Sequence, residues 1–154
     1  MGGDMKTSFS RLLILILILG TTLAAKAGPF GLGVILGEPT GVSMKYWNSK
    51  ITAIDGAIAW SFEDESALHL HADYLLHAFN LIDVSKGDLP LYYGLGVRLK
   101  LQKKDQLGIR IPLGMAYHFE KAPLDIFLEI VPILELIPST ELGFNGSIGI
   151  RYYF

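Results

Sequence analysis

The sequence predicts an all-β protein, an eight-stranded antiparallel up-and-down transmembrane β-barrel preceded by a cleaved signal peptide. Apolar and polar residues alternate with a period of two through most of residues 28–154, and successive side chains of a strand point to opposite faces of a sheet. No Asp, Glu, Lys, Arg or His falls on the apolar face of any alternating segment. The pattern continues to the last segment, in which one face carries Phe144, Ile148, Ile150, Tyr152 and Phe154.

Composition limits the class of protein. The chain has 154 residues, enough for one domain, and no cysteine, which excludes disulfide bonds and thiolate metal sites. Its 13 basic and 15 acidic residues become 10 and 14 when a leader containing Lys6, Arg11, Lys26 and Asp4 is removed. We therefore expect no basic surface and no nucleic-acid partner.

Residues 1–27 have the three parts of a secretory signal peptide, and residues 28–154 are predicted to form the barrel. Lys6 and Arg11 precede an apolar run at 12–19, and Ala25-Lys26-Ala27 provides a small-x-small cleavage site. The alternative is an uncleaved membrane anchor. The uncharged stretch at 12–25 is short for a helical span, which needs about 20 residues.

Eight strands are expected in the mature chain, separated by turns rich in Gly, Pro, Asn, Asp and Ser. The longest connection is predicted at about 80–88. The expected strands are 30–36, 41–47, 54–62, 68–77, 91–101, 107–119, 125–136 and 144–154.

Two features disagree with regular strands. Pro112 and Pro132 lie inside predicted strands, where proline removes a ladder hydrogen bond, so we expect β-bulges there that could invert the faces beyond them. Residues 68–79 and 124–137 also tolerate a helical reading. Helices at these positions would leave the sheet unable to close.

The charge-free face is expected to contact lipid, because a Lys or Arg there costs roughly 2–4 kcal/mol at the bilayer midplane. The opposite face then lines the lumen, and an eight-stranded barrel is just wide enough for side chains to fill it. We predict a lumen closed by an ion-pair network, in which Arg110 reaches Glu129 or Glu135. The network comprises Lys45, Asp55, Asp73, Arg98, Lys100, Arg110, Asp125, Glu129, Glu135 and Arg151, and the lumen histidines are His69, His71, His77 and His118.

The column formed by His69, His71, Asp73 and His77 is the strongest candidate for metal chemistry, since imidazole and carboxylate groups ligate zinc or copper. The alternative is that these side chains belong to the polar network that fills the lumen. Without a second cluster of ligands, we expect the latter, with no metal and no cofactor.

Several stretches resemble a family of small, uncharacterised outer-membrane β-barrel proteins, related in architecture to the OmpA transmembrane domain and OmpX. They are FGLGVILGEPTGVSMKYW (30–47), LHLHADY (68–74), LPLYYGLGVRLK (89–100), PLDIFLEIV (123–131) and the ending 149–154. The resemblance implies an outer-membrane location and no particular reaction. The ending also resembles the closing strand of such barrels, which implies an assembly signal at Ile148, Ile150, Tyr152 and Phe154 that is read by the barrel-assembly machinery.

The function expected is structural: a monomeric outer-membrane barrel that maintains membrane integrity, has lipids as partners and transports no large solutes. One alternative is a lipid A-modifying enzyme at the outer leaflet, for which Ser61, Ser66 and His69 with Glu63 and Glu65 are candidates, although no motif of such enzymes is recognisable. The others are a narrow ion channel and a surface-binding barrel.

Aromatic residues suggest the orientation, because they gather at the membrane interfaces of barrels. Most lie at the strand ends expected in the periplasm, namely Phe30, Tyr46, Phe79, Tyr93, Tyr117, Phe119, Tyr152 and Phe154; Trp60, Phe62 and Phe144 lie at the other rim.

Overall fold

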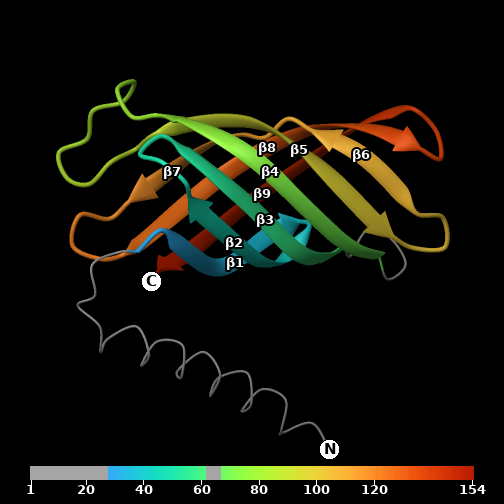
Figure 1. The fold of residues 1–154 in the computed structure, drawn as a ribbon, viewed down its shortest axis with the longest axis horizontal. Coiled ribbons are helices and arrows are strands. Elements are labelled where there is room, and N and C mark those ends of the chain that lie inside the picture. Colours follow the sequence, from blue (N-terminus) through green and yellow to red (C-terminus); the bar gives the residue numbers. More distant parts are fainter. Residues whose placement is uncertain (1–27, 62–66) are drawn as a thin grey trace, which may run out of the picture.

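The computed structural model describes residues 28–61 and 67–154. All its regular elements are antiparallel strands, wound into the ring seen in Figure 1. They are β1 (Phe30–Glu38), β2 (Thr40–Trp47), β3 (Thr52–Ser61), β4 (Ala67–Ala78), β5 (Leu91–Leu101), β6 (Gln106–Arg110), β7 (Leu113–His118), β8 (Leu124–Ile137) and β9 (Glu141–Tyr153). In the described ranges, no helix is long and apolar enough to cross a membrane. The predicted signal peptide, 1–27, lies outside these ranges.

The ring is closed by two pairings. β1 pairs with both β2 and β9, and β4 pairs with β5 at the other side of the sheet. β6 and β7 each pair with β5 and β8, so they share one position between these two strands. The nine strands thus fill eight positions of a closed ring. This confirms the all-β prediction. It excludes the helical alternative, because residues 68–78 lie in β4 and residues 124–137 lie in β8.

Pro112 interrupts one predicted strand without inverting its faces. The amide of Gly94 donates to the carbonyl of Pro112 at 3.0 Å and that of Ile111 to the carbonyl of Pro132 at 3.0 Å. A proline nitrogen cannot donate the return bond in either pair. Residue pairing with β5 and β8 nevertheless keeps one register from Arg110 to Leu113.

The prediction of bulges at the prolines was therefore wrong in position. β8 runs through Pro132 without a break. The one irregularity in the pairing with β6 lies near the strand ends, between Leu107 and Gly108. Inward and outward faces consequently persist past both prolines, and Glu129 and Glu135 are buried on either side of Pro132.

The two ends of the ring differ. The terminal end holds Pro29 and Phe154, the turn at 48–51, the turn at 119–123 and the longest connection, 79–90, which is drawn at the left of Figure 1. The opposite end holds the turns at Pro39, 102–105 and 138–140. The long connection is tied down by Tyr117, whose hydroxyl donates to the carbonyl of Lys86 at 3.0 Å.

Candidate functional site

The interior of the ring, the lumen, contains every charged side chain predicted to line it. Arg110 is 1% exposed and Arg151 2%, and the remaining members are also buried: Lys45, Asp55, Asp73, Arg98, Lys100, Asp125, Glu129 and Glu135. The strand alternation explains this arrangement, since each of these residues occupies the inward parity of its strand. Buried ionised groups require partners, and the lumen supplies them.

Two arginines organise the central ion pairs. Arg110 Nε lies 2.9 Å from Asp73 Oδ1, and Arg110 Nη2 lies 3.2 Å from Glu129 Oε1. Arg151 Nη2 lies 2.8 Å from Asp55 Oδ2, and its Nη1 lies 3.6 Å from Asp125 Oδ2. Each guanidinium therefore bridges two carboxylates on different strands. Arg110 reaches Glu129, as one of the two predicted options, but its second partner is Asp73 rather than Glu135.

Further pairs extend this network along the lumen. Arg98 pairs with Glu135 toward the opposite end. Two tyrosine hydroxyls donate to carboxylates: Tyr92 to Glu129 at 2.9 Å and Tyr153 to Asp125 at 2.6 Å. Together with the arginines, these bonds connect most strands of the ring across its interior.

Glycines on intervening strands make these contacts possible. Gly96 of β5 pairs with Asp73 on one side and with Arg110 on the other. Gly108 likewise lies between Arg98 and Glu135. With no side chain on the middle strand, the long side chain of one neighbour lies over the glycine and reaches the next strand. The same arrangement recurs at Gly114 between Tyr92 and Glu129, and at Gly33 between Arg151 and Ser43.

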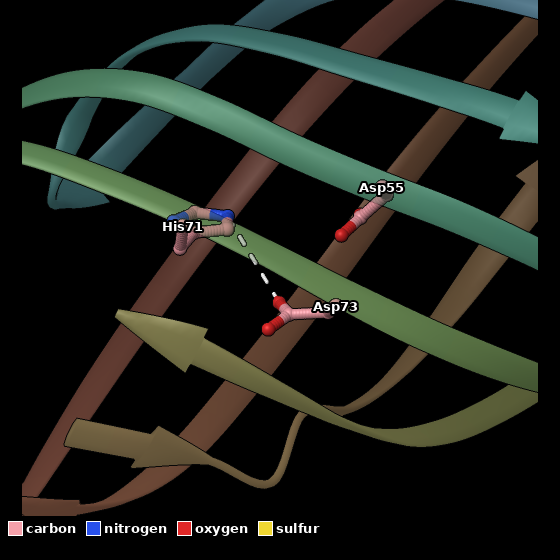
Figure 2. A group of neighbouring side chains, drawn as sticks. All are labelled: Asp55, His71 and Asp73. Carbon is pink, nitrogen blue, oxygen red and sulfur yellow. Dashed lines mark ion pairs between the residues drawn. The ribbon is translucent and has the colours of Figure 1, made fainter. Parts of the chain in front are cut away.

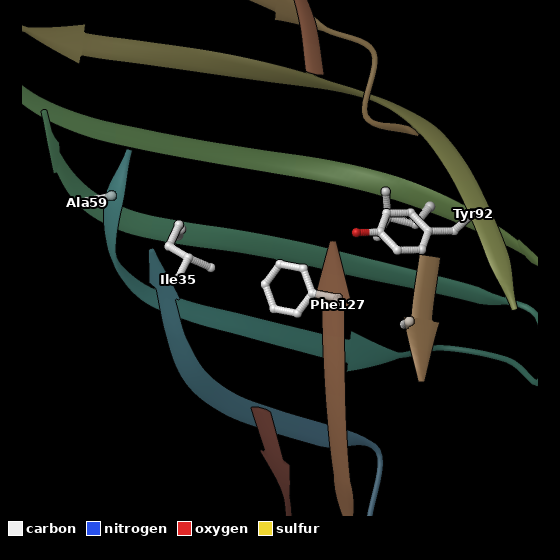
Figure 3. Packing of buried hydrophobic residues seen from close by; sticks show 7 residues of the cluster. Ile35, Ala59, Tyr92 and Phe127 are labelled. Atoms are coloured by element: carbon white, nitrogen blue, oxygen red, sulfur yellow. The ribbon is translucent and has the colours of Figure 1, made fainter. Parts of the chain in front are cut away.

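Apolar side chains fill the lumen between the charged groups, and sequence reasoning missed Phe127 among them. A cluster of Ile35, Ala57, Ala59, Leu75, Tyr92, Ala116 and Phe127 is buried inside the ring, as Figure 3 shows for its labelled members. The guanidinium carbon of Arg151 lies 3.8 Å from the ring centroid of Phe127. The segment around Phe127 is apolar on both faces, so period-two alternation alone gave little signal there.

The terminal end of the lumen is aromatic. Lys45 Nζ lies 2.8 Å from His77 Nε2 and 4.5 Å from the centroid of the Trp47 ring. Phe79 and His118 have ring centroids 5.8 Å apart. Phe79, expected among the aromatic residues of the periplasmic strand ends, lies at this end and contacts Trp47 and His118. An open pocket of about 440 Å³ lies at this end, lined by Trp47, Phe79, His118 and Tyr153 among others.

The predicted histidine column does not form one site. His69 pairs with Lys100 and His77 with Tyr92, positions that are eight residues apart on β4 and hence roughly 26 Å. A hydrogen bond joins His77 to Lys45 at the terminal end, where His118 also lies. The side chains that converge are Asp55, His71 and Asp73, drawn in Figure 2, each offering one ligand atom within 4.8 Å of the others.

Of the candidates for catalysis, the structure describes the side chain of His69 alone. His69 is buried in the lumen at 2% exposure. Glu63, Glu65 and Ser66 lie outside the described residues, as does the side chain of Ser61.

The predicted assembly residues lie on the outward face of β9. Ile148 and Ile150 are exposed, as is Phe154 just beyond the strand, and the Tyr152 and Phe154 rings pack edge to face with centroids 5.0 Å apart. Their role in assembly stays a prediction.

The fold and the lumen together define a class: a small closed antiparallel β-ring with a salt-bridged interior. The chain belongs to the family described as "Protein of unknown function (DUF3996)", whose model matches residues 23–154. Its structure is similar to the crystal structure of the N-terminal β-barrel domain of Pseudomonas aeruginosa OprF, with a TM-score of 0.63 and 10% sequence identity, covering 84% of this chain and 100% of that chain. Comparison with curated proteins gave no match. At this identity the OprF similarity supports the β-barrel fold alone.

Proposed function

We propose that the protein is an integral outer-membrane β-barrel whose lumen is closed by its own side chains and whose role is structural, in membrane integrity. The observation that carries the proposal is the sorting of side chains between the two faces of the ring. In the described strands, the charged residues are buried, except Glu38 and Glu141 at strand ends. The outward face is apolar around the whole ring.

This outward surface is unsuited to water. Leu95 is 61% exposed, Ile130 58% and Leu36 58%, and exposed apolar residues occur on every strand position of the ring. Soluble proteins rarely expose continuous apolar patches larger than a few hundred Å². Such a charge-free apolar surface suits lipid, because the hydrocarbon core of a bilayer solvates apolar side chains and offers no partner for a charged one.

Strand length fits a bilayer. β3 has 10 residues, β4 12, β5 11, β8 14 and β9 13, and a tilted strand needs about 9–11 residues to span the hydrocarbon core. Among the described strands, closure of the ring also leaves no unpaired sheet edge, which a lipid-exposed sheet cannot tolerate. The OprF barrel domain supports the same architecture.

A closed lumen is supported by its contents. The central void, between Asp55, Arg110, Arg151 and their neighbours, has a volume of about 10 Å³, close to the minimum for one water molecule. Such a lumen does not transport large solutes. The bridging arginines hold opposing walls of the ring together, so the network stabilises the barrel as it closes the lumen.

Planar-bilayer recording tests the closed lumen. Purified protein, refolded and inserted, is expected to give current no larger than protein-free bilayers. Insertion is verified by flotation with vesicles and by resistance to protease. Steady single-channel conductance by the inserted wild type would contradict the proposal and favour the narrow-channel alternative.

Deletion of the gene tests the structural role. The deletion strain is expected to admit more of a large hydrophilic antibiotic than the parent, with restoration by the wild-type gene. Lipid A mass spectra are expected to be identical in both strains. Unchanged permeability together with altered acylation of lipid A would replace the structural role with the enzymatic alternative.

A further inference from the structure

Asp55, His71 and Asp73 converge at the centre of the lumen, although they come from two strands. Asp55 on β3 is directly opposite Asp73 on β4 in the strand register. His71 precedes Asp73 by two residues and therefore shares its inward face. Figure 2 shows the three side chains directed toward one another. One ligand atom from each lies within 4.8 Å of the other two.

Two of these groups have buried atoms without a hydrogen-bond partner. The His71 side chain is 7% exposed, yet its Nδ1 has no partner, and its Nε2 is 4.0 Å from Asp73 Oδ2, too far for a hydrogen bond. Asp55 Oδ1 also lacks a partner, while Oδ2 accepts from Arg151. Leaving such atoms unsatisfied in a protein interior costs free energy. A ligand that accepts lone pairs from these atoms removes that cost.

The surrounding charges favour a cation as this ligand. Four carboxylates contact the two central arginines: Asp55, Asp73, Asp125 and Glu129. Lys45 is opposite Asp55 in the register, and Arg98, which pairs with Glu135, is opposite His71. With these three residues included, the layer has five acidic groups against four basic ones. A bound anion would increase this imbalance, whereas a cation offsets it.

The structure has space for an ion beside these groups. The void of about 10 Å³ is lined by Asp55 and His71, and also by Glu38 and Pro39 at the β1–β2 turn. Arg110 and Arg151 hold the carboxylates of Asp73 and Asp55 by hydrogen bonds of 2.8–3.0 Å, as second-layer donors commonly fix ligating side chains.

We propose that Asp55, His71 and Asp73 bind one divalent transition-metal ion of the zinc type. One imidazole nitrogen and two carboxylate oxygens are ligands that zinc accepts, with water at a fourth position. Ligand atoms about 2.0–2.1 Å from a tetrahedral ion lie about 3.4 Å from each other, so small side-chain rotations bring the trio to that geometry. The site differs from a column of histidines along β4, because it needs the opposite strand.

Calorimetry with zinc chloride and chelator-treated, refolded full-length protein in detergent tests the proposal. Wild-type protein is expected to bind one Zn²⁺ with micromolar affinity or better. His71→Gln is expected to weaken binding about tenfold or more. His69→Gln is the matched control, because His69 is a buried histidine on the same face of β4, two residues away; it is expected to retain the wild-type affinity.

A measurement on the wild type alone guards against variants that fail to fold. Zinc K-edge absorption of protein loaded with less than one equivalent is expected to show one imidazole ligand and otherwise oxygen. Two or more imidazoles would contradict the proposal. So would absence of zinc binding by the wild type, or a loss in His69→Gln as large as that in His71→Gln. The zinc measurements require the folded ring but no membrane role, so their failure would leave the structural proposal intact.

Discussion

Arg110 and Asp73 form their ion pair directly over Gly96. Both residues pair with this glycine in the strand register, and Arg110 Nε lies 2.9 Å from Asp73 Oδ1 and 3.0 Å from Oδ2. The guanidinium thus crosses a whole strand, which only a residue without a side chain permits. A Cβ placed on Gly96 would come 1.8 Å from Asp73 Oδ1 and 2.4 Å from the carbonyl oxygen of Ala72.

Gly96→Ala is therefore expected to destabilise the barrel by about 1–3 kcal/mol, the usual cost of overpacking. The backbone carbonyl of Ala72 cannot move aside as a flexible side chain could. Gly146→Ala is the matched control, since a Cβ at Gly146 meets nothing within 4 Å. Urea titration of both variants in lipid vesicles, followed by tryptophan fluorescence, measures the difference. Equal stability of the two variants would mean that the space over Gly96 is not needed.

The Arg98–Glu135 pair tests whether the buried charges depend on each other. Arg98→Met leaves Glu135 buried without its cation, so we expect a loss of about 3–5 kcal/mol. The double variant Arg98→Met with Glu135→Met removes both charges and is expected to recover most of that stability, because an apolar pair can replace a buried ion pair at little cost. The unfolding free energies of the wild type, both single variants and the double variant complete the cycle. Additive losses would show that the two side chains do not interact.

Charge on the outward face is expected to be costly according to depth. Leu95→Lys places an ammonium near the middle of β5 and should cost roughly 2–4 kcal/mol in a bilayer, whereas Leu142→Lys near the strand end should cost about 0–1 kcal/mol. Both leucines are exposed, at 61% and 67%, so burial in protein does not distinguish them. Reversible unfolding in vesicles gives both values. Similar costs for the two substitutions would argue against a hydrocarbon layer at mid-strand.

Much of the ring could be predicted from alternation, because burial on one face is a local property of each strand. The inward charged residues follow from parity alone. Their partners do not, since Arg110 meets Asp73 through the relative register of β4, β5 and β6, which no single segment encodes. Asp55 likewise joins His71 and Asp73 only through the pairing of β3 with β4.

The effect of the prolines, and the inward face of segments that are apolar on both faces, were harder to predict from the sequence. Pro112 splits a strand but keeps its register, because neighbouring strands on both sides hold the chain in place. Phe127, Val131 and Ile133 point inward although they are as apolar as their outward neighbours. Only the charged residues between them, such as Glu129, mark the inward parity in the sequence.

Spin-label accessibility in lipid vesicles tests the sorting of side chains most directly. Because the chain has no native cysteine, one introduced cysteine gives one label at a known position. Labels at Leu95, Leu128 and Ile148, on three strands of the outward face, are predicted to collide readily with oxygen and hardly at all with a water-soluble nickel complex. A label at Ser139 in the β8–β9 turn is predicted to show the reverse. Ready access of the nickel complex to Leu95, Leu128 and Ile148 in protein that is folded and bound to vesicles would contradict a lipid-facing belt.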